Sequence, residues 1–257
     1  MDENILGKKV FFLYPHSVIR DELIKLIMHY EYEVYLLNNH VKTTKLMAKY
    51  PDAVLFINID EAQKESEWEA YIKELMTNAA TKDVRIGILS YEKNPELEKK
   101  YLMDIMVPCG FVNLKLGLKE SARIILKTLE VNEVKGRRKY IRIKCDSSNP
   151  GTLNVKINGK FQTGKVIDIS SVGMACIFNS KAVELDPKEV VNDIQLRLKA
   201  YICTVSGVVI GSRKLDNDTL YVILFNKNID AQSKSKIQEF ISKTLQNSID
   251  REMDAIK

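Results

Sequence analysis

The chain has 257 residues, of which 45% are hydrophobic and 28% charged, with a formal net charge of +5 at pH 7. This composition is that of a globular protein long enough for two ordinary domains, and the mild charge argues against a general nucleic-acid coat. No stretch approaches the roughly 18 apolar residues of a membrane-spanning helix, and the acids near the N-terminus argue against a signal peptide, so we expect a cytoplasmic protein without membrane insertion.

The first half of the chain alternates buried strands with amphipathic helices. Continuous apolar runs, bounded by charged or turn residues, predict strands at 8–14, 33–37, 53–59, 84–89 and 111–116. Apolar residues at helical spacing predict helices at 17–30 (which includes Ile19), 41–50, 68–76, after 94–95 and at 118–129. This alternation predicts a doubly wound, flavodoxin-like α/β domain over residues 1–130.

The second half changes from helical spacing to alternation. A basic linker at 131–142 leads into segments that read as strands, and Asn158-Gly159 between two of them predicts a type I′ hairpin. A period-two run predicts one strand from Ile194 to Ile202 with Ala200 and Ile202 facing inward. Further strands are expected near 138–145, 161–169, 172–178, 205–214 and 219–225, followed by a helix at 231–253. We expect a small antiparallel barrel with a terminal helix over 143–257.

The four cysteines do not form a metal-binding pattern, because none of them pair at ligand spacing and the three histidines all lie in the first forty residues. Each cysteine lies in an apolar or strand-like run, which is typical of a buried, reduced thiol. We therefore expect no metal site. The cysteines are Cys109, Cys145, Cys176 and Cys203.

Two short stretches carry the chemistry: Arg137-Arg138-Lys139-Tyr140-Ile141-Arg142 and, about thirty residues later, Asp168-Ile169-Ser170-Ser171-Val172-Gly173. A guanidinium fork matches the O6 and N7 edge of guanine and also pairs with phosphate. A carboxylate at 168 can accept from guanine N1–H and N2–H₂, and the hydroxyl at 170 can bond a base or a phosphate oxygen. A glycine at 173 permits a positive φ or a close backbone approach. The alternative for the first stretch is a solvated linker that binds no ligand.

The combination Arg138-x-x-x-Arg142 followed by Asp168-x-Ser170-x-x-Gly173 resembles the two-part signature of PilZ domains, which are six-stranded β-barrels that bind cyclic di-GMP. The resemblance implies that these five residues bind the dinucleotide. It also implies a receptor that is not an enzyme and that uses no cofactor apart from this ligand.

The resemblance covers roughly residues 135–240 and extends to Arg137, the residue just before the first motif arginine. An arginine there is similar to PilZ members that take a stacked, intercalated dimer of the dinucleotide, so we expect two ligands per domain. Because the arginines lie on the linker, binding is expected to change the arrangement of the two domains and thereby regulate an unidentified protein partner. Nucleic acid is not expected as a partner.

The first domain resembles the receiver domain of two-component response regulators in element order and length. Receivers hold Mg²⁺ with paired acids after the first strand and accept phosphate on an Asp that ends the third. This chain has Tyr14-Pro15-His16 at the first place and Ile57 at the second, with Asn58 and Asp60 out of register. We expect a degenerate domain that does not take a phosphate. The alternatives are a phosphorylation-controlled response regulator and an interaction scaffold, or a nucleic-acid binder, that uses the basic linker as a general anion site and whose PilZ-like module binds no dinucleotide.

Overall fold

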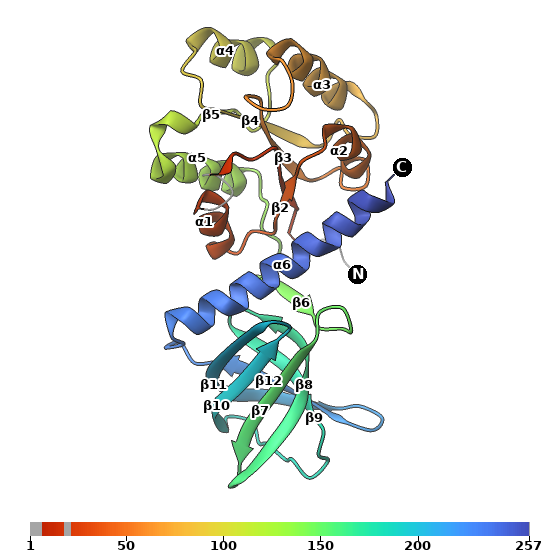
Figure 1. Cartoon of the computed structure of the whole chain (residues 1–257), viewed down its shortest axis with the longest axis vertical. Coiled ribbons are helices and arrows are strands. Elements are labelled where there is room, and N and C mark those ends of the chain that lie inside the picture. Colours follow the sequence, from red (N-terminus) through yellow and green to blue (C-terminus); the bar gives the residue numbers. More distant parts are fainter. Residues whose placement is uncertain (1–6, 18–21, 257) are drawn as a thin grey trace. The chain divides into compact units, whose positions relative to one another are not determined.

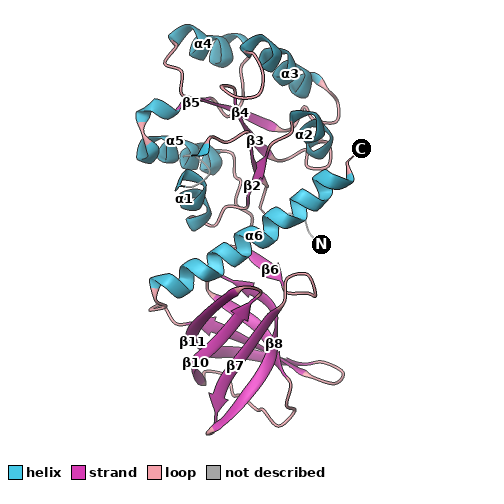
Figure 2. Ribbon diagram, viewed as in Figure 1, coloured by secondary structure: helices cyan, strands magenta, loops and turns pink. Residues whose placement is uncertain are grey.

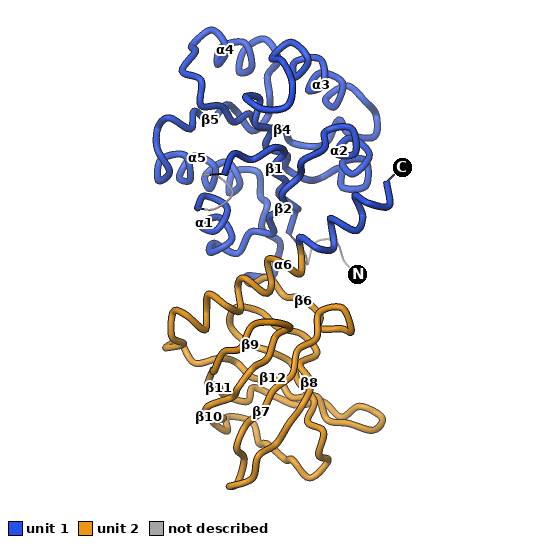
Figure 3. The backbone as a smooth tube through the Cα atoms, in the orientation of Figure 1, with its two compact units in different colours: residues 1–139, 246–257 blue, residues 140–245 orange. Residues whose placement is uncertain are grey.

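The computed structural model describes residues 7–17 and 22–256, and the chain divides into two compact units (Figure 3). Unit 1 comprises Met1–Lys139 and Gln246–Lys257, and unit 2 comprises Tyr140–Leu245. Ile19, which was expected in the first helix, lies outside the described residues.

Unit 1 is built on a five-stranded parallel sheet with the order β2-β1-β3-β4-β5. Figure 1 shows α1 and α5 on one side of this sheet and α2 and α3 on the other, which confirms the predicted α/β domain. The strands are β1 Val10–Leu13, β2 Val34–Leu37, β3 Val54–Asn58, β4 Arg85–Ser90 and β5 Phe111–Asn113. The helices are α1 Ile24–His29, α2 His40–Met47, α3 Glu65–Thr77, α4 Pro95–Lys99 with a π-helical continuation Lys100–Asp104, and α5 Leu118–Val131.

Burial of apolar residues and side-chain caps explain where these strands and helices form. Every residue of β1 and β3 is buried, as expected for central parallel strands covered on both faces. The Asn39 side chain accepts from the Lys42 N–H and caps α2, and Asn94 caps α4 in the same way. The predicted strand 111–116 is too long, because the Asn113 side chain accepts from the Lys115 N–H and starts a 3₁₀ turn.

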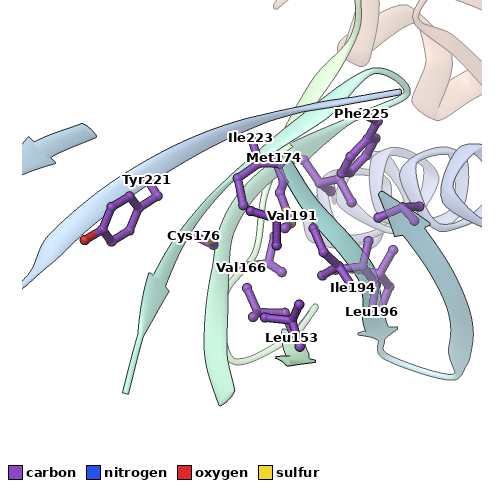
Figure 4. Packing of buried hydrophobic residues seen from close by; sticks show 14 of the residues in the cluster. Leu153, Val166, Met174, Cys176, Val191, Ile194, Leu196, Tyr221, Ile223 and Phe225 are labelled. Carbon is purple, nitrogen blue, oxygen red and sulfur yellow. The ribbon is translucent and has the colours of Figure 1, made fainter. Parts of the chain in front are cut away.

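Unit 2 is an antiparallel barrel, as predicted (Figure 2). The sheet order is β6-β8-β7-β10-β11-β12-β9, and pairing of β8 with β9 closes a barrel of six strands, with β6 added along β8. Figure 4 shows how side chains from opposite strands meet in its interior. The strands are β6 Arg142–Lys144, β7 Gly151–Ile157, β8 Lys160–Ser170, β9 Gly173–Phe178, β10 Val190–Leu198, β11 Tyr201–Lys214 and β12 Thr219–Phe225.

Two hairpins of the barrel test the turn predictions. Asn158 and Gly159 both have positive φ, 49° and 81°, as the predicted type I′ turn requires. The predicted single strand over 194–202 is wrong, because β10 ends at Leu198 and β11 begins at Tyr201. Directly paired residues share a face, so Tyr201 takes the face of Leu198 and Ile202 points outward with 62% of its surface exposed.

The last helix, α6 Ala231–Ala255, contributes to both units. Ile237, Phe240 and Ile241 belong to the core of the barrel. Residues 246–257 cluster with unit 1, and Ile249 and Met253 are buried. None of the helices in the described part of the chain combines the length and the apolar character that crossing a membrane requires.

Candidate ligand-binding site

The second motif forms a tight turn between β8 and β9. Ser170 pairs with Gly173, and Ser171 and Val172 connect them. Ser170 is only 1% exposed, and its hydroxyl donates to the Gly173 carbonyl oxygen at 3.1 Å and accepts from the Val172 N–H at 3.4 Å. The hydroxyl, which was expected to face the ligand, therefore shapes the turn in this structure.

Gly173 lies where two strands approach closely. A Cβ at this position would lie 2.6 Å from the Ile223 carbonyl oxygen and 3.3 Å from the Leu224 Cα, both on β12. Contacts this short with backbone atoms exclude any side chain unless the strands move apart. Of the two roles expected for this glycine, the structure therefore shows the close backbone approach.

Arg142 and Asp168 lie side by side on the outside of the barrel. β6 runs along the end of β8, so that Arg142 pairs with Ser170 and Lys144 with Asp168. The Arg142 Nη1 and Asp168 Oδ1 atoms are 3.5 Å apart, with 43% and 23% of the two side chains exposed. The Oδ1 atom is nevertheless buried and receives no hydrogen bond. A carboxylate oxygen in this state has a cation nearby but still lacks a donor.

Lys144 is a neighbour of Asp168 that the sequence analysis missed. Arg142 and Lys144 are exposed while Ile143, between them, is buried, so the alternation along β6 directs both cations outward. The alternation was visible in the sequence. The register that sets Lys144 opposite Asp168 was not, because no turn connects β6 directly to β8.

Cys145 follows this strand as a free, partly buried cysteine. Burial, together with the nearby carboxylates of Asp168 and Asp146, raises the pKa of its thiol to about 12. The thiol therefore stays protonated at neutral pH and is a poor nucleophile and a poor metal ligand. Across residues 7–17 and 22–256, no cluster of three or more His, Cys, Asp or Glu residues could hold a metal ion.

The other two arginines of the first motif belong to unit 1. Arg137 and Arg138 are both exposed, and Arg137 lines an open pocket of about 760 Å³ within that unit. In the same pocket the Lys135 ammonium lies 4.8 Å from the centre of the Tyr32 ring. The structure thus brings together Arg142, Asp168, Ser170 and Gly173, and it describes Arg137 and Arg138 as part of the other unit.

The end of β3 carries no carboxylate. The strand ends at Asn58, directly after Ile57, the residue aligned with the phosphate-accepting Asp of a receiver. The Asn58 side chain is buried and donates to the Tyr14 carbonyl oxygen at 2.9 Å. Asp60 accepts from the Ser90 hydroxyl and the Tyr91 N–H, both at 2.6 Å. Both of its oxygens are thus engaged, and the amide is no phosphoryl acceptor.

Comparison with known families identifies the second unit. A family model described as "PilZ domain" matches residues 136–243, so the chain contains a PilZ domain, as the two-part signature indicated. The matched residues include both motifs. A comparison with curated proteins gave no match.

Several solved structures are similar to part of the chain, at low sequence identity. YcgR of Escherichia coli in complex with c-di-GMP is 17% identical, with 48% of this chain and 52% of that chain covered and a TM-score of 0.40. The MrkH–c-di-GMP complex of K. pneumonia is 20% identical over 46% of this chain and 57% of that chain, with a TM-score of 0.39. The chemotaxis response regulator CheY4 of Vibrio cholerae is 18% identical over 49% and 98%, with a TM-score of 0.39. The chain therefore spans about half the length of the YcgR chain.

Proposed function

We propose that the protein is a receptor for cyclic di-GMP and that the ligand binds outside the barrel where β6, β8 and β9 meet. The PilZ match supports the ligand class. The main support for this site is the Asp168 Oδ1 atom, which is buried, lies beside the exposed Arg142 and lacks a hydrogen-bond donor. Guanine N1–H and N2–H₂ are donors that this carboxylate can accept.

Each motif residue has a role in this proposal. The Arg142 guanidinium binds a phosphate or the O6 and N7 edge of a guanine. Arg138 supplies a second guanidinium, and Arg137 stacks with or pairs to a second dinucleotide, which gives two ligands per domain. Ser170 and Gly173 hold the β8–β9 turn in shape and present backbone groups to the ligand.

The pair of Arg142 and Asp168 is well suited to exchange partners. An ion pair between partly exposed side chains contributes only about 0–1 kcal/mol to stability, so little is lost when a ligand separates the two groups. Both groups then gain charge-assisted hydrogen bonds, which are about twice as strong as neutral ones.

We further propose that binding alters the arrangement of the two units, because Arg137 and Arg138 are drawn toward the face of the barrel. The ligand can drive such a change only as far as it binds the two arrangements with different affinity. Small-angle scattering with and without saturating ligand tests this step, and identical curves would contradict it. The change would in turn regulate a protein partner.

Calorimetric titration with cyclic di-GMP tests the receptor itself. We expect a stoichiometry of two and a loss of affinity of at least tenfold for Arg142→Ala and for Asp168→Ala. Arg197→Ala is the matched control, because Arg197 is an exposed arginine on β10 outside both motifs. Cyclic di-AMP should not bind, since adenine lacks O6 and the N1–H donor. Equal binding of both dinucleotides, or no heat at tens of micromolar cyclic di-GMP, would refute the proposal.

A further inference from the structure

The net charge of the chain is confined to unit 2. Residues 140–245 contain 15 Lys and Arg against 10 Asp and Glu, whereas the remaining residues contain 24 of each. The mild value of +5 for the whole chain therefore conceals a neutral unit and a basic one. The distribution of these charges over the barrel decides whether they form a binding surface.

Five of the 15 cations of unit 2, and none of its acids, lie on one group of segments in β8, β7, β10, the β10–β11 turn and the start of β11. These strands are neighbours in the sheet, and Figure 2 shows them together. Their segments 151–157, 160–167 and 194–205, with the β10–β11 turn, contain no Asp or Glu. The same segments hold five basic residues, all exposed: Lys156, Lys160, Lys165, Arg197 and Lys199. We call the outward-facing residues of these segments the basic face.

Strand register arranges the basic face in rows. One row runs Lys165, Thr152, Arg197 and Ile202, and the Lys236 ammonium of α6 extends it by donating to the Ile202 carbonyl oxygen at 2.9 Å. The next row carries only short hydrogen-bonding side chains, namely Thr163, Asn154, Gln195 and Thr204. In the last row Lys156 pairs with Phe161, whose side chain is 74% exposed.

No ion pair is found for Lys156, Lys165 or Arg197 within the described residues. The nearest acids on these strands are Asp193, in the irregular part of β10, and Asp168, which lies beside Arg142. Lys and Arg without an acidic partner, together with Thr, Asn and Gln, are residue types that commonly contact nucleic-acid phosphates. An exposed aromatic ring beside them is a platform on which an unpaired base can stack.

We propose that the basic face binds single-stranded nucleic acid, with backbone phosphates held by Lys156, Lys165 and Arg197 and a base stacked on Phe161. The face spans about 14 Å along and across the strands, which accommodates a few nucleotides. A duplex offers no unpaired base to Phe161. An amphipathic protein helix needs an apolar groove, which the Thr and Asn row does not provide, and stable membrane anchoring needs more apolar insertion than one ring.

Fluorescence anisotropy of a labelled twelve-nucleotide oligothymidylate with the full-length protein tests this proposal, which does not depend on cyclic di-GMP binding. With three phosphates neutralised, affinity should fall roughly twentyfold between 50 and 200 mM salt, since the log–log slope is about −0.7 per phosphate. Phe161→Ala should weaken binding about tenfold and leave the salt dependence unchanged.

Charge-reversal variants locate the site. Lys165→Glu combined with Arg197→Glu should abolish measurable binding. The control is Lys181→Glu combined with Lys214→Glu, which changes the net charge by the same amount at a pocket formed by other segments of the barrel. This control should retain most of the oligonucleotide binding. Lys165→Gln with Arg197→Gln serves if the first pair impairs folding, judged by thermal unfolding. Equal losses in the two charge-reversal pairs, equal competition by polyglutamate, or tighter binding of a duplex would each overturn the proposal.

Discussion

The side-chain amide of Gln246 forms hydrogen bonds with both backbone polar groups of Leu36. Its Oε1 accepts from the Leu36 N–H at 2.8 Å and its Nε2 donates to the Leu36 carbonyl oxygen at 2.9 Å. Leu36 lies in β2, the edge strand of the unit 1 sheet. An edge strand presents unpaired backbone groups that invite pairing with other chains, and the amide occupies them as a neighbouring strand would.

This contact predicts a specific stability effect. Gln246→Ala should lower the free energy of unfolding by about 1–3 kcal/mol, because it removes two hydrogen bonds from a partly buried site. Gln246→Glu should cost at least as much, since a carboxylate cannot donate to the Leu36 carbonyl. Hydrogen exchange at the Leu36 amide reports the local effect. Gln232→Ala, at an exposed position of the first turn of α6, is the control. If the Leu36 amide exchanges as slowly in the Gln246 variants as in this control, the role of Gln246 is contradicted.

The requirement for a guanidinium at 142 is separable from the requirement for charge. Arg142→Lys retains the charge but loses the planar fork, so it should weaken cyclic di-GMP binding by at least tenfold. The exposed position of Arg142 predicts a change in stability below about 1 kcal/mol. Titration calorimetry and chemical unfolding of the same preparation measure both quantities. Wild-type affinity in Arg142→Lys would mean that the site senses charge alone.

The two barrel glycines Gly173 and Gly211 should respond differently to alanine. At Gly173 the new methyl group would lie 2.6 Å from a backbone oxygen of β12, whereas at Gly211 nothing lies within 4 Å. We expect Gly173→Ala to destabilise the protein by more than about 2 kcal/mol, in the range of overpacked sites. Gly211→Ala should change stability by less than about 1 kcal/mol. Thermal unfolding distinguishes the two, and a harmless Gly173→Ala would assign this glycine to the ligand alone.

Buried thiols predict a loss of stability at alkaline pH. Burial raises the pKa to about 11 for Cys109 and Cys203 and to about 12 for Cys176, above the value of about 8.5 for an exposed thiol. The protonated thiols therefore stabilise the folded state fully below pH 8.5, and this stabilisation is lost as the pH rises toward 11–12. At pH 9.5 each thiol should cost about 1 kcal/mol. Urea unfolding at pH 7.5 and 9.5 measures the loss, which should be smaller in Cys176→Ala.

Local chemistry made part of this structure predictable from sequence. The Asn158-Gly159 turn was identifiable because both residues tolerate positive φ. The turn at Lys199 and Ala200 was not, because Lys199 adopts a φ of 56° without belonging to the usual turn residues. The alternation of apolar residues over 194–202 continues across this turn, and it therefore led to the prediction of one strand.

The candidate site shows the same limit. Its residue types pointed to the chemistry, because guanidinium and carboxylate groups have defined partners. The neighbourhood of Arg142 and Asp168 depends on the register of β6 against β8, which is set by packing over a long stretch of chain. The burial of Ser170 and the confinement of the net charge to unit 2 likewise follow from tertiary structure.

The hydrogen bond from Asn58 to the Tyr14 carbonyl makes a carboxylate unfavourable at this position. Replacing Asn58 by Asp would set a buried carboxylate against that carbonyl oxygen and lose the donor. Paired acids would also be needed in place of Tyr14 and Pro15 before the site could hold Mg²⁺. A single substitution at Asn58 would therefore lose stability without creating a site that can hold Mg²⁺.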